Sequence, residues 1–358
     1  MSPKIKNRIK KLVGGLGGKD IDGILISQPE NRRYLSGFDG SAGFLLITPD
    51  KRILATDSRY TVQAKSQAPD YEIFLITGDA GDWFPGLAAQ AGIKRLGFEG
   101  EYLTFSLYRR LCDILGKGKS RLEFIPVEGM VESLRAVKEP GEIELIAQAA
   151  GIADAAMVYI RDNIRPGMTE REAAWEIEKF MREKGSQPLP FDIIVASGPN
   201  SALPHAQPSS RAIREAEPIV IDIGARVGGY ASDLSRTICL GDPDATFKKI
   251  YDTVLGAQTG AIALLKSGMS GAEADQLARV IIEEGGYGEA FGHGLGHGVG
   301  LATHEQPRLG PNSPEKLADG MVFTIEPGIY LEGWGGVRIE DLVMMEAGKV
   351  REISKAKK

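Results

Sequence analysis

The chain has few cysteines, few histidines and no long apolar run, and each scarcity excludes a class of protein. Its 358 residues include two cysteines, far apart and without a Cys-x-x-C pair. This excludes a disulfide framework, and Cys112 and Cys239 are predicted to be small buried side chains in a reducing cytoplasm. No apolar run approaches the roughly 18 residues that cross a bilayer, and no signal-peptide core follows the basic N-terminus, so neither membrane insertion nor secretion is expected. The net charge of −5 argues against nucleic acid as a partner.

The four histidines are confined to residues 205–304. Three of them lie within 291–304, where glycines at 294, 296, 298 and 300 surround His297. Histidines placed by packing or solubility would be spread along the chain, so their clustering indicates a functional site. The glycines remove side chains on both sides of His297, which lets the backbone approach a crowded site.

The same half of the chain carries two pairs of acids on strand-like runs, Asp222 with Asp233 and Glu326 with Glu340. A half-buried carboxylate costs several kcal/mol unless a cation compensates its charge. Four carboxylates with one imidazole, that of His297, form a hard ligand set. Such a set favours Mn²⁺, with Co²⁺, Fe²⁺ or Zn²⁺ as substitutes, over a thiolate zinc site. Two divalent ions would neutralise the four negative charges, so the pattern predicts a metal-dependent hydrolase.

These acids belong to an internal repeat. Residues 164–173 recur as 265–274, and each copy contains a Gly-Met pair and a capping box that starts an amphipathic helix after an apolar one. A His-x-Gln-Pro segment follows in each copy, at 205–208 and 304–307. The capping boxes are Thr169 with Glu172 and Ser270 with Glu273. Two such units packed about a pseudo-twofold axis would bring the four acids together, with a histidine from each copy beside them.

The first 127 residues form a separate α/β pattern without a catalytic constellation. Helices are predicted over 57–68 and 103–116, and an opening helix carries basic residues on a solvated face. Strands are predicted over 23–27, 44–48, 52–56, 72–76, 95–98 and 122–127. A charged segment over 128–145, interrupted by Pro140, is interpreted as a hinge, and 146–358 as the catalytic domain.

Four motifs together resemble the pita-bread metallopeptidase family, which contains methionine aminopeptidase, aminopeptidase P and prolidase. They are Ile-Asp222-x-Gly…Tyr230-x-Ser-Asp233-x-x-Arg236-Thr237, His293-Gly-x-Gly-His297-Gly-x-Gly…His304-Glu305, Thr324-x-Glu326-Pro-Gly-x-Tyr330 and Gly-Val-Arg338-Ile-Glu340-Asp341. The resemblance is strong over roughly 135–358, and the first part resembles the creatinase-type N-terminal domain of aminopeptidase P and prolidase. It implies a creatinase-type α/β domain followed by an α+β pita-bread domain with a pseudo-twofold repeat.

The resemblance also implies a ligand set for two metal ions. Asp222, Asp233, His297, Glu326 and Glu340 would bind the ions, with Asp233 and Glu340 bridging both. Glu326 or Glu340 would accept the proton of the attacking water.

Other residues receive roles by the same resemblance. His304 would steady the tetrahedral oxyanion, and His205 and His293 would line the substrate and help proton transfer to the leaving nitrogen. Tyr330 and Arg338, on the substrate side, would orient the ligands.

Two neighbours of the ligands carry further expectations. Consecutive strand residues face opposite sides, so Glu340 is predicted to point inward and Asp341 outward. Ser235 replaces a commoner threonine, and its hydroxyl is expected to bond a ligand carboxylate.

Family members with this layout act on peptides with proline in second position. Segments 31–43 and 55–64 resemble the N-terminal domain of bacterial aminopeptidase P-like proteins, which favours an Xaa-Pro aminopeptidase. Arg308 favours the alternative, an Xaa-Pro dipeptidase (prolidase), because an arginine there can clamp a free C-terminal carboxylate. A metal-free creatinase-like hydrolase and a non-catalytic binding module are more distant alternatives, both disfavoured by the intact ligands. A homodimer is the family expectation.

Overall fold

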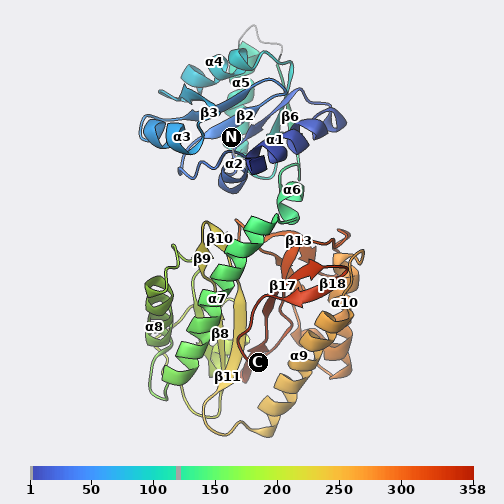
Figure 1. The fold of residues 1–358 in the computed structure, drawn as a ribbon. Coiled ribbons are helices and arrows are strands. Elements are labelled where there is room, and N and C mark those ends of the chain that lie inside the picture. The colour runs from blue at the N-terminus through green and yellow to red at the C-terminus, as the bar shows by residue number, and fades with distance from the viewer. Residues whose placement is uncertain (1–2, 118–121) are drawn as a thin grey trace. The chain divides into compact units, whose positions relative to one another are not determined.

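The computed structural model describes residues 3–117 and 122–358, and the chain forms two compact units, Met1–Arg135 and Ala136–Lys358 (Figure 1). The boundary lies within the segment 128–145. That segment, interpreted from sequence as a hinge, contains helix α6 (Glu132–Ala136) and the first turns of helix α7 (Pro140–Asn163). Ordered helices therefore occupy most of it.

The first unit is an α/β domain around one six-stranded mixed sheet, in the order β4-β3-β2-β1-β5-β6. β1–β2 and β2–β3 pair antiparallel, whereas β1–β5, β5–β6 and β3–β4 pair parallel. The strands are β1 Gly23–Ile26, β2 Phe44–Ile47, β3 Arg52–Thr56, β4 Glu72–Leu75, β5 Arg95–Glu99 and β6 Glu123–Val127. The six predicted strands are confirmed, because short apolar runs bounded by turn residues are a local signal, and β1, β2 and β3 are buried along almost their whole length.

The helices of this unit were harder to predict than its strands. They are α1 Pro3–Gly15, α2 Pro29–Ser36, α3 Thr61–Gln67, α4 Ala80–Ala91 and α5 Phe105–Lys117, with a 3₁₀ turn η1 at Gly17–Lys19. The helix predicted over 57–68 begins late because Asp57 accepts hydrogen bonds from Arg59 in a preceding turn. Neither α2 nor α4 was predicted, and α4 has Pro85 in its interior, which interrupts the helical pattern.

The structure corrects two expectations about which side chains are buried, one for a basic residue of the opening helix and one for the two cysteines. Arg8 of the opening helix is buried rather than solvated, because its guanidinium lies 3.9 Å from the centre of the Tyr34 ring and donates to the Tyr34 carbonyl oxygen at 3.0 Å. Both Cys112 and Cys239 are free thiols, and each is partly exposed rather than buried.

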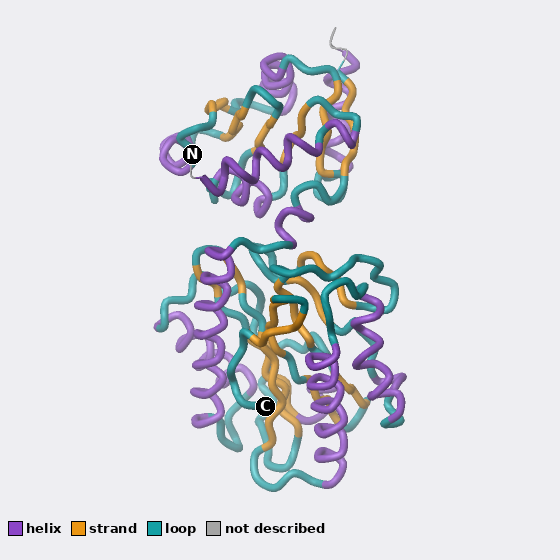
Figure 2. Tube along the Cα trace, turned by 45° about the vertical axis from the view of Figure 1, so that its right-hand side comes forward, coloured by secondary structure: helices purple, strands orange, loops and turns teal. Residues whose placement is uncertain are grey.

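The second unit contains two copies of a helix–helix–strand arrangement, with the strands in the middle and the helix pairs on either side (Figures 1 and 2). The first copy comprises α7, α8 Glu170–Glu183, β7 Ile194–Ser197, η2 Gly198–Ala202, β8 Pro218–Ile223, β9 Arg226–Val227, β10 Tyr230–Ala231 and β11 Leu234–Cys239. The second comprises α9 Ala245–Leu264, α10 Gly271–Glu284, η3 Gly288–Ala290, β12 Gly296–Gly298, β13 Glu305–Leu309, β14 Val322–Ile325, β15 Gly328–Leu331, β16 Gly335–Arg338, β17 Asp341–Glu346 and β18 Lys349–Glu352. The sheet orders are β11-β8-β7 and β13-β12-β14-β17-β18, with β9–β10 and β15–β16 as short ribbons.

The two copies match in local detail. Gly167 and Gly268, just before the second helix of each copy, have φ angles of 90° and 89°. Both capping boxes form, at Thr169 with Glu172 and at Ser270 with Glu273. The internal repeat predicted from the sequence is therefore confirmed in the backbone as well.

Helix α7 is the one helix, within the part of the chain that the structure describes, that is long and apolar enough to span a membrane. Eight of its residues are buried. Ala149, Ala153, Met157 and Ile160 belong to the core of the first copy, together with Ile219 and Ile221 of β8 and its neighbours. Packing in the core accounts for the apolar composition of this helix.

Candidate active site

One cavity of about 820 Å³ in the second unit collects the predicted site residues of both copies. Ten of the eleven residues predicted from the sequence line it, and Arg308 does not. The ten are His205, Asp222, Asp233, His293, His297, His304, Glu326, Tyr330, Arg338 and Glu340. The repeat thus brings together side chains that lie more than a hundred residues apart.

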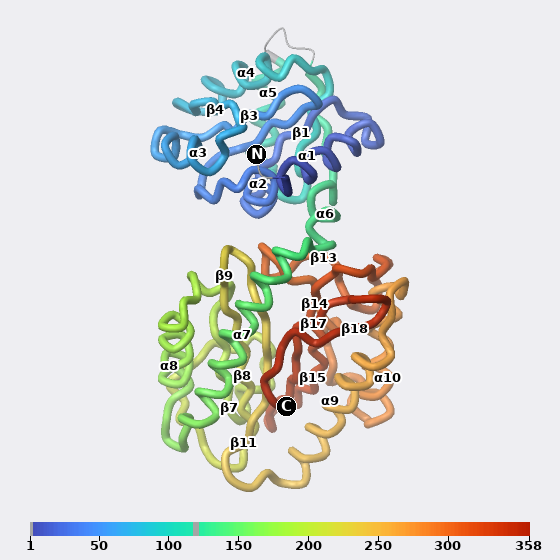
Figure 3. The backbone as a smooth tube through the Cα atoms, in the orientation of Figure 1, coloured from blue at the N-terminus to red at the C-terminus, as the bar shows by residue number. Residues whose placement is uncertain are grey.

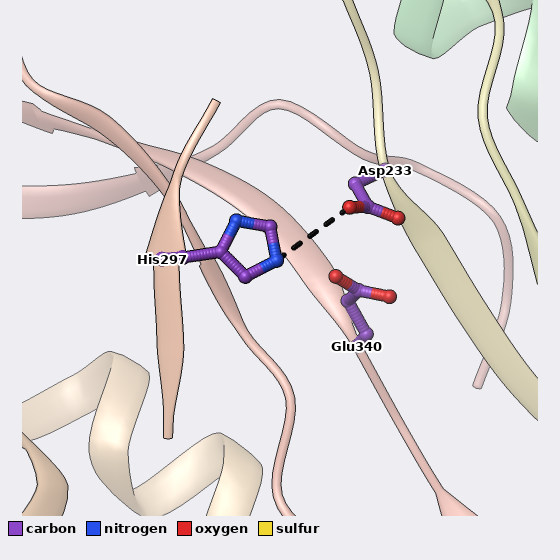
Figure 4. Close-up of side chains that lie close together, drawn as sticks. All are labelled: Asp233, His297 and Glu340. Atoms are coloured by element: carbon purple, nitrogen blue, oxygen red, sulfur yellow. Dashed lines mark ion pairs between the residues drawn. The ribbon is translucent and has the colours of Figure 1, made fainter. Parts of the chain in front are cut away.

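Three of the predicted metal ligands converge in the lining of this cavity. Asp233, His297 and Glu340 each offer a ligand atom, and these atoms lie within 4.8 Å of one another. Asp233 immediately precedes β11, His297 lies on β12 and Glu340 joins β16 to β17, and Figure 4 shows the three side chains pointing toward one another. Because Asp233 belongs to the first copy and His297 and Glu340 to the second, the packing of the two copies sets their separation.

The imidazole of His297 is oriented for metal binding. Its Nδ1 lies 3.1 Å from the Gly298 carbonyl oxygen, to which it can only donate. The other nitrogen, Nε2, then carries a lone pair and lies 3.3 Å from Glu326 Oε1 and 3.7 Å from Asp233 Oδ2. Burial lowers the pKa of His297, which favours the neutral ring that binds metals.

The acids of the site lack sufficient positive charge from the protein. Burial raises the pKa of Asp233 and of Glu340 well above the usual range, and the neighbouring carboxylates add to the effect. Among the described residues, Asp222 Oδ1 and Glu340 Oε2 are buried without a hydrogen-bond partner. Oxygen lone pairs that are buried and unpaired are costly unless a cation accepts them. The donor set therefore fits hard divalent ions.

Arg338 and Tyr330 form a hydrogen-bonded support beside the ligands. The Arg338 guanidinium donates to Asp222 Oδ2 at 2.7 Å, and the Tyr330 hydroxyl lies 3.0 Å from both Arg338 and His293 Nε2. Arg338 also donates to Ser235 Oγ at 2.9 Å. The expectation that the Ser235 hydroxyl bonds a ligand carboxylate was wrong, because it faces the guanidinium that holds Asp222.

The remaining histidines border the cavity. The His304 ring lies 4.0 Å from that of His297, between centroids, and burial together with His297 lowers the pKa of His304 to about 4. Burial likewise lowers the pKa of His293. His205 is exposed at the cavity wall. All three rings are therefore placed to meet a substrate that enters the cavity.

The glycines around His297 permit a close approach of backbone, but of neighbouring strands rather than of a ligand. A Cβ at Gly296 would lie 2.1 Å from the Thr324 carbonyl oxygen of β14, and one at Gly298 would lie 2.1 Å from the Gln306 carbonyl oxygen of β13. These contacts fix β12 between its two partners. The crowding predicted around His297 is confirmed, with a structural origin that the sequence did not reveal.

Asp341 points away from the ligands, as strand alternation predicts, but not into solvent. It is fully buried and pairs with Arg236 at 2.7 Å. The face of β17 that points away from the ligands is therefore also buried, because the C-terminal segment covers it.

Sequence reasoning missed the residue that anchors the loop carrying His205. Glu170, fully buried at the start of α8, accepts hydrogen bonds from Ser197 and from both the amide and the hydroxyl of Ser209. In the second copy its counterpart is Gly271, where a Cβ would lie 2.0 Å from the carbonyl oxygen of Arg308. Comparison of the two repeat copies could have singled out this pair of positions.

Arg308 lies beside the cavity rather than in its lining. It is the register partner of His297 across β12 and β13, so both side chains project from the same face. Its side chain is exposed and makes no ion pair with any residue in 3–117 or 122–358. The guanidinium is therefore free to meet an anion at the edge of the site.

Comparison with known proteins agrees with this geometry. Residues 144–347 match the model of metallopeptidase family M24, and residues 8–137 match the creatinase/prolidase N-terminal domain. The chain is 38% identical to an Xaa-Pro dipeptidase of Pyrococcus horikoshii, over 99% of this chain and 98% of the relative. An Xaa-Pro dipeptidase structure from Bacillus anthracis is 43% identical, with a TM-score of 0.94 over 99% of this chain and 98% of that one. An X-Pro aminopeptidase structure from Thermotoga maritima is 39% identical, with a TM-score of 0.89 over 98% of each chain. The chain belongs to metallopeptidase family M24, with a creatinase-type N-terminal domain and a pita-bread catalytic domain.

Proposed function

We propose that this protein is a metal-dependent exopeptidase that hydrolyses the bond between an N-terminal residue and a following proline. The observation that carries the proposal is the convergence of Asp233, His297 and Glu340 within 4.8 Å, in the lining of a cavity that Asp222 and Glu326 also line. The relatives named for Xaa-Pro cleavage, which match nearly the whole chain, support the choice of substrate.

The five ligands would hold two divalent ions, and Mn²⁺ is the proposed metal because four carboxylates and one imidazole form a hard donor set. Such ions, when bound, activate a water molecule and polarise the scissile carbonyl. Buried carboxylates with unpaired oxygens, such as Asp222 Oδ1 and Glu340 Oε2, are consistent with this assignment.

The protein's own groups would bind the peptide and move protons. A carboxylate of Glu340 or Glu326 accepts a proton from the attacking water. His304, next to His297, steadies the oxyanion. The leaving nitrogen of an Xaa-Pro bond is tertiary and must gain a proton to depart. His293, held by the Tyr330 hydroxyl, and His205 on the cavity wall serve that transfer.

Two substrate classes follow from two observations. The aminopeptidase assignment rests on the N-terminal motifs at 31–43 and 55–64, and on likeness to the Thermotoga maritima structure. Arg308 favours a dipeptidase, because a free guanidinium on the face of His297 can bind the C-terminal carboxylate of a dipeptide. We further propose a cytoplasmic homodimer, for which the family resemblance is the basis.

An end-point hydrolysis assay with added Mn²⁺ tests the proposal, comparing Ala-Pro with longer peptides that begin Ala-Pro, with EDTA as the control. Release of alanine from the longer peptides supports the aminopeptidase. Cleavage of the dipeptide alone supports the dipeptidase and gives Arg308 its role. No metal-dependent cleavage of either substrate contradicts the proposed function.

A further inference from the structure

A buried ionic cluster lies behind the ligand carboxylates, on the side away from the cavity. Arg236 of β11 donates to Asp341 Oδ1 of β17 at 2.7 Å, and Lys358 Nζ lies 2.8 Å from Asp341 Oδ2. Gln258 of α9 donates to the same Oδ2 at 2.8 Å. Arg236 is 1% exposed and Asp341 0% exposed. We call Arg236, Asp341 and Lys358 the rear clamp.

The chain segment 354–358 belongs to this cluster. Arg236 donates to the carbonyl oxygens of Ala356 at 2.6 Å and Lys357 at 3.2 Å. Asp154 of α7 accepts from the amides of Lys355 and Ala356 at 2.8–3.0 Å. The end marked C lies between α7 and α9 in Figure 3, and the segment contacts both repeat copies, through Asp154 and Arg236 of the first and Asp341 of the second.

The rear clamp is joined directly to the backbone of the ligands. Asp341 follows Glu340, and Arg236 lies three residues after Asp233. Arg236 donates to the carbonyl oxygen of Glu340 as well as to that of Ser235, at 2.9 Å for the latter. The Glu340 amide donates to the Ser235 carbonyl oxygen at 3.0 Å. One guanidinium thus bridges the strand that carries Asp233 and the strand that carries Glu340.

The site needs such a bridge because its carboxylates repel one another. Asp233 and Glu340 come from different copies, and no covalent link shorter than about a hundred residues joins them. When these carboxylates are ionised they repel one another on the cavity side, and the rear clamp ties their backbone segments together on the opposite side. A fixed separation of ligands matters because metal affinity depends on their preorganised geometry.

We propose that Arg236, Asp341 and the segment 354–358 act as positioning residues that set the separation of Asp233 and Glu340 and so raise the affinity of the site for its metal pair. Lys358 is the outermost member of the cluster, where its ammonium lies between Asp341 at 2.8 Å and Glu352 at 2.7 Å. This inference rests on the proposed function, because it concerns the same metal site.

The test measures binding of Mn²⁺ to the full-length, chelator-stripped protein by titration calorimetry, with the thermal midpoint of the metal-free protein recorded in parallel. Lys358→Met removes the positive charge at this position, and Lys358→Arg retains it. Lys357→Met is the matched control, since the Lys357 side chain is exposed and only its carbonyl oxygen is used. Asp341→Asn removes the central charge of the rear clamp.

Asp341→Asn is expected to raise the Mn²⁺ Kd by roughly tenfold, the range for residues that support metal ligands. Lys358→Met should raise it less, in the same direction, while Lys358→Arg and Lys357→Met keep the wild-type value. If Asp341→Asn does not fold, the Mn²⁺ Kd of Lys358→Met alone tests the proposal. A lowered thermal midpoint with a Kd within about twofold of wild type would show a purely structural role and overturn the proposal. Absence of Mn²⁺ binding in the wild type would instead overturn the metal site itself, and the rear clamp's role with it.

Discussion

Substitution of Arg338 by methionine offers the sharpest test of how the site is held together. The Arg338 side chain is 3% exposed and donates to Asp222 Oδ2 at 2.7 Å. It also donates to Ser235 Oγ at 2.9 Å, to the Pro204 carbonyl oxygen at 3.1 Å and to the Tyr330 hydroxyl at 3.0 Å. Methionine keeps much of the apolar volume but leaves the Asp222 carboxylate buried among other acids without its cation.

Breaking a buried ion pair from one side costs about 3–5 kcal/mol, because the remaining charge has lost both its partner and its water. We therefore expect Arg338→Met to lower the free energy of unfolding of the metal-free catalytic unit by that amount. Saturating Mn²⁺ should reduce the loss, since the metal then compensates Asp222. The direction of this metal dependence separates an electrostatic cause from a simple packing defect.

Urea unfolding followed by tryptophan fluorescence measures the change. Trp175 and Trp334 lie in the second unit and Trp83 in the first, so a Trp83→Phe background restricts the signal to the catalytic unit. The control is Arg351→Met, which removes a half-exposed pair with Glu346 at the same distance of 2.7 Å. An exposed pair contributes about 0–1 kcal/mol. Equal losses for the two variants would refute the reasoning, as would a loss for Arg338→Met that metal does not reduce.

Three further predictions concern the ligands, the substrate and a helix start. Asp233→Asn and Glu340→Gln should each leave less than about a tenth of the metal-dependent peptidase activity, because each changes a proposed bridging ligand. Higher activity in either variant would contradict the two-metal assignment. Arg308→Ala should raise the KM for Ala-Pro roughly tenfold, in line with the loss of one hydrogen bond between charged groups. The KM for longer peptides should not change. Equal effects on both substrates would exclude a carboxylate clamp. Hydrogen bonds from the backbone and hydroxyl of Ser270 lower the pKa of Glu273 from 4.5 to about 2. The ionised Glu273 side chain therefore stabilises the fold above pH 4.5, and this stabilisation is lost as the pH falls toward 2. The difference in thermal midpoint between wild type and Glu273→Gln should disappear over that interval. A difference that does not change with pH would contradict the capping role.

Features with a local sequence signature could be predicted because their cause is local. The capping boxes at Thr169 and Ser270 require only a hydroxyl and a carboxylate three residues apart, and both form. The strands of the first unit are short apolar runs between turn residues, and the sequence located each within one residue of its ends. Helix α4 was missed, since Pro85 in its interior argues against a helix while its Asp79 cap forms nonetheless.

The support of the site could not be predicted in the same way. Arg338 and Asp222 are 116 residues apart, and Arg236 and Asp341 are 105 apart. No periodicity links such positions. The sequence contains many acidic residues, and nothing in it shows which of them each arginine contacts. Glu170, which anchors the loop of His205, lies in the first turn of α8, where an acidic residue is common and carries no signal of its own.

The sequence by itself determined the chemical inventory: one imidazole among glycines, four acids on strand ends and a repeat that requires them to converge. Only the tertiary structure decided which carboxylates lie beside a cation, which oxygens remain unpaired and which side of each strand is buried. Asp341 illustrates the difference, because strand alternation correctly turned it away from Glu340 but could not show that the segment 354–358 buries it. Alternation is a property of one strand, whereas burial depends on every element packed against it.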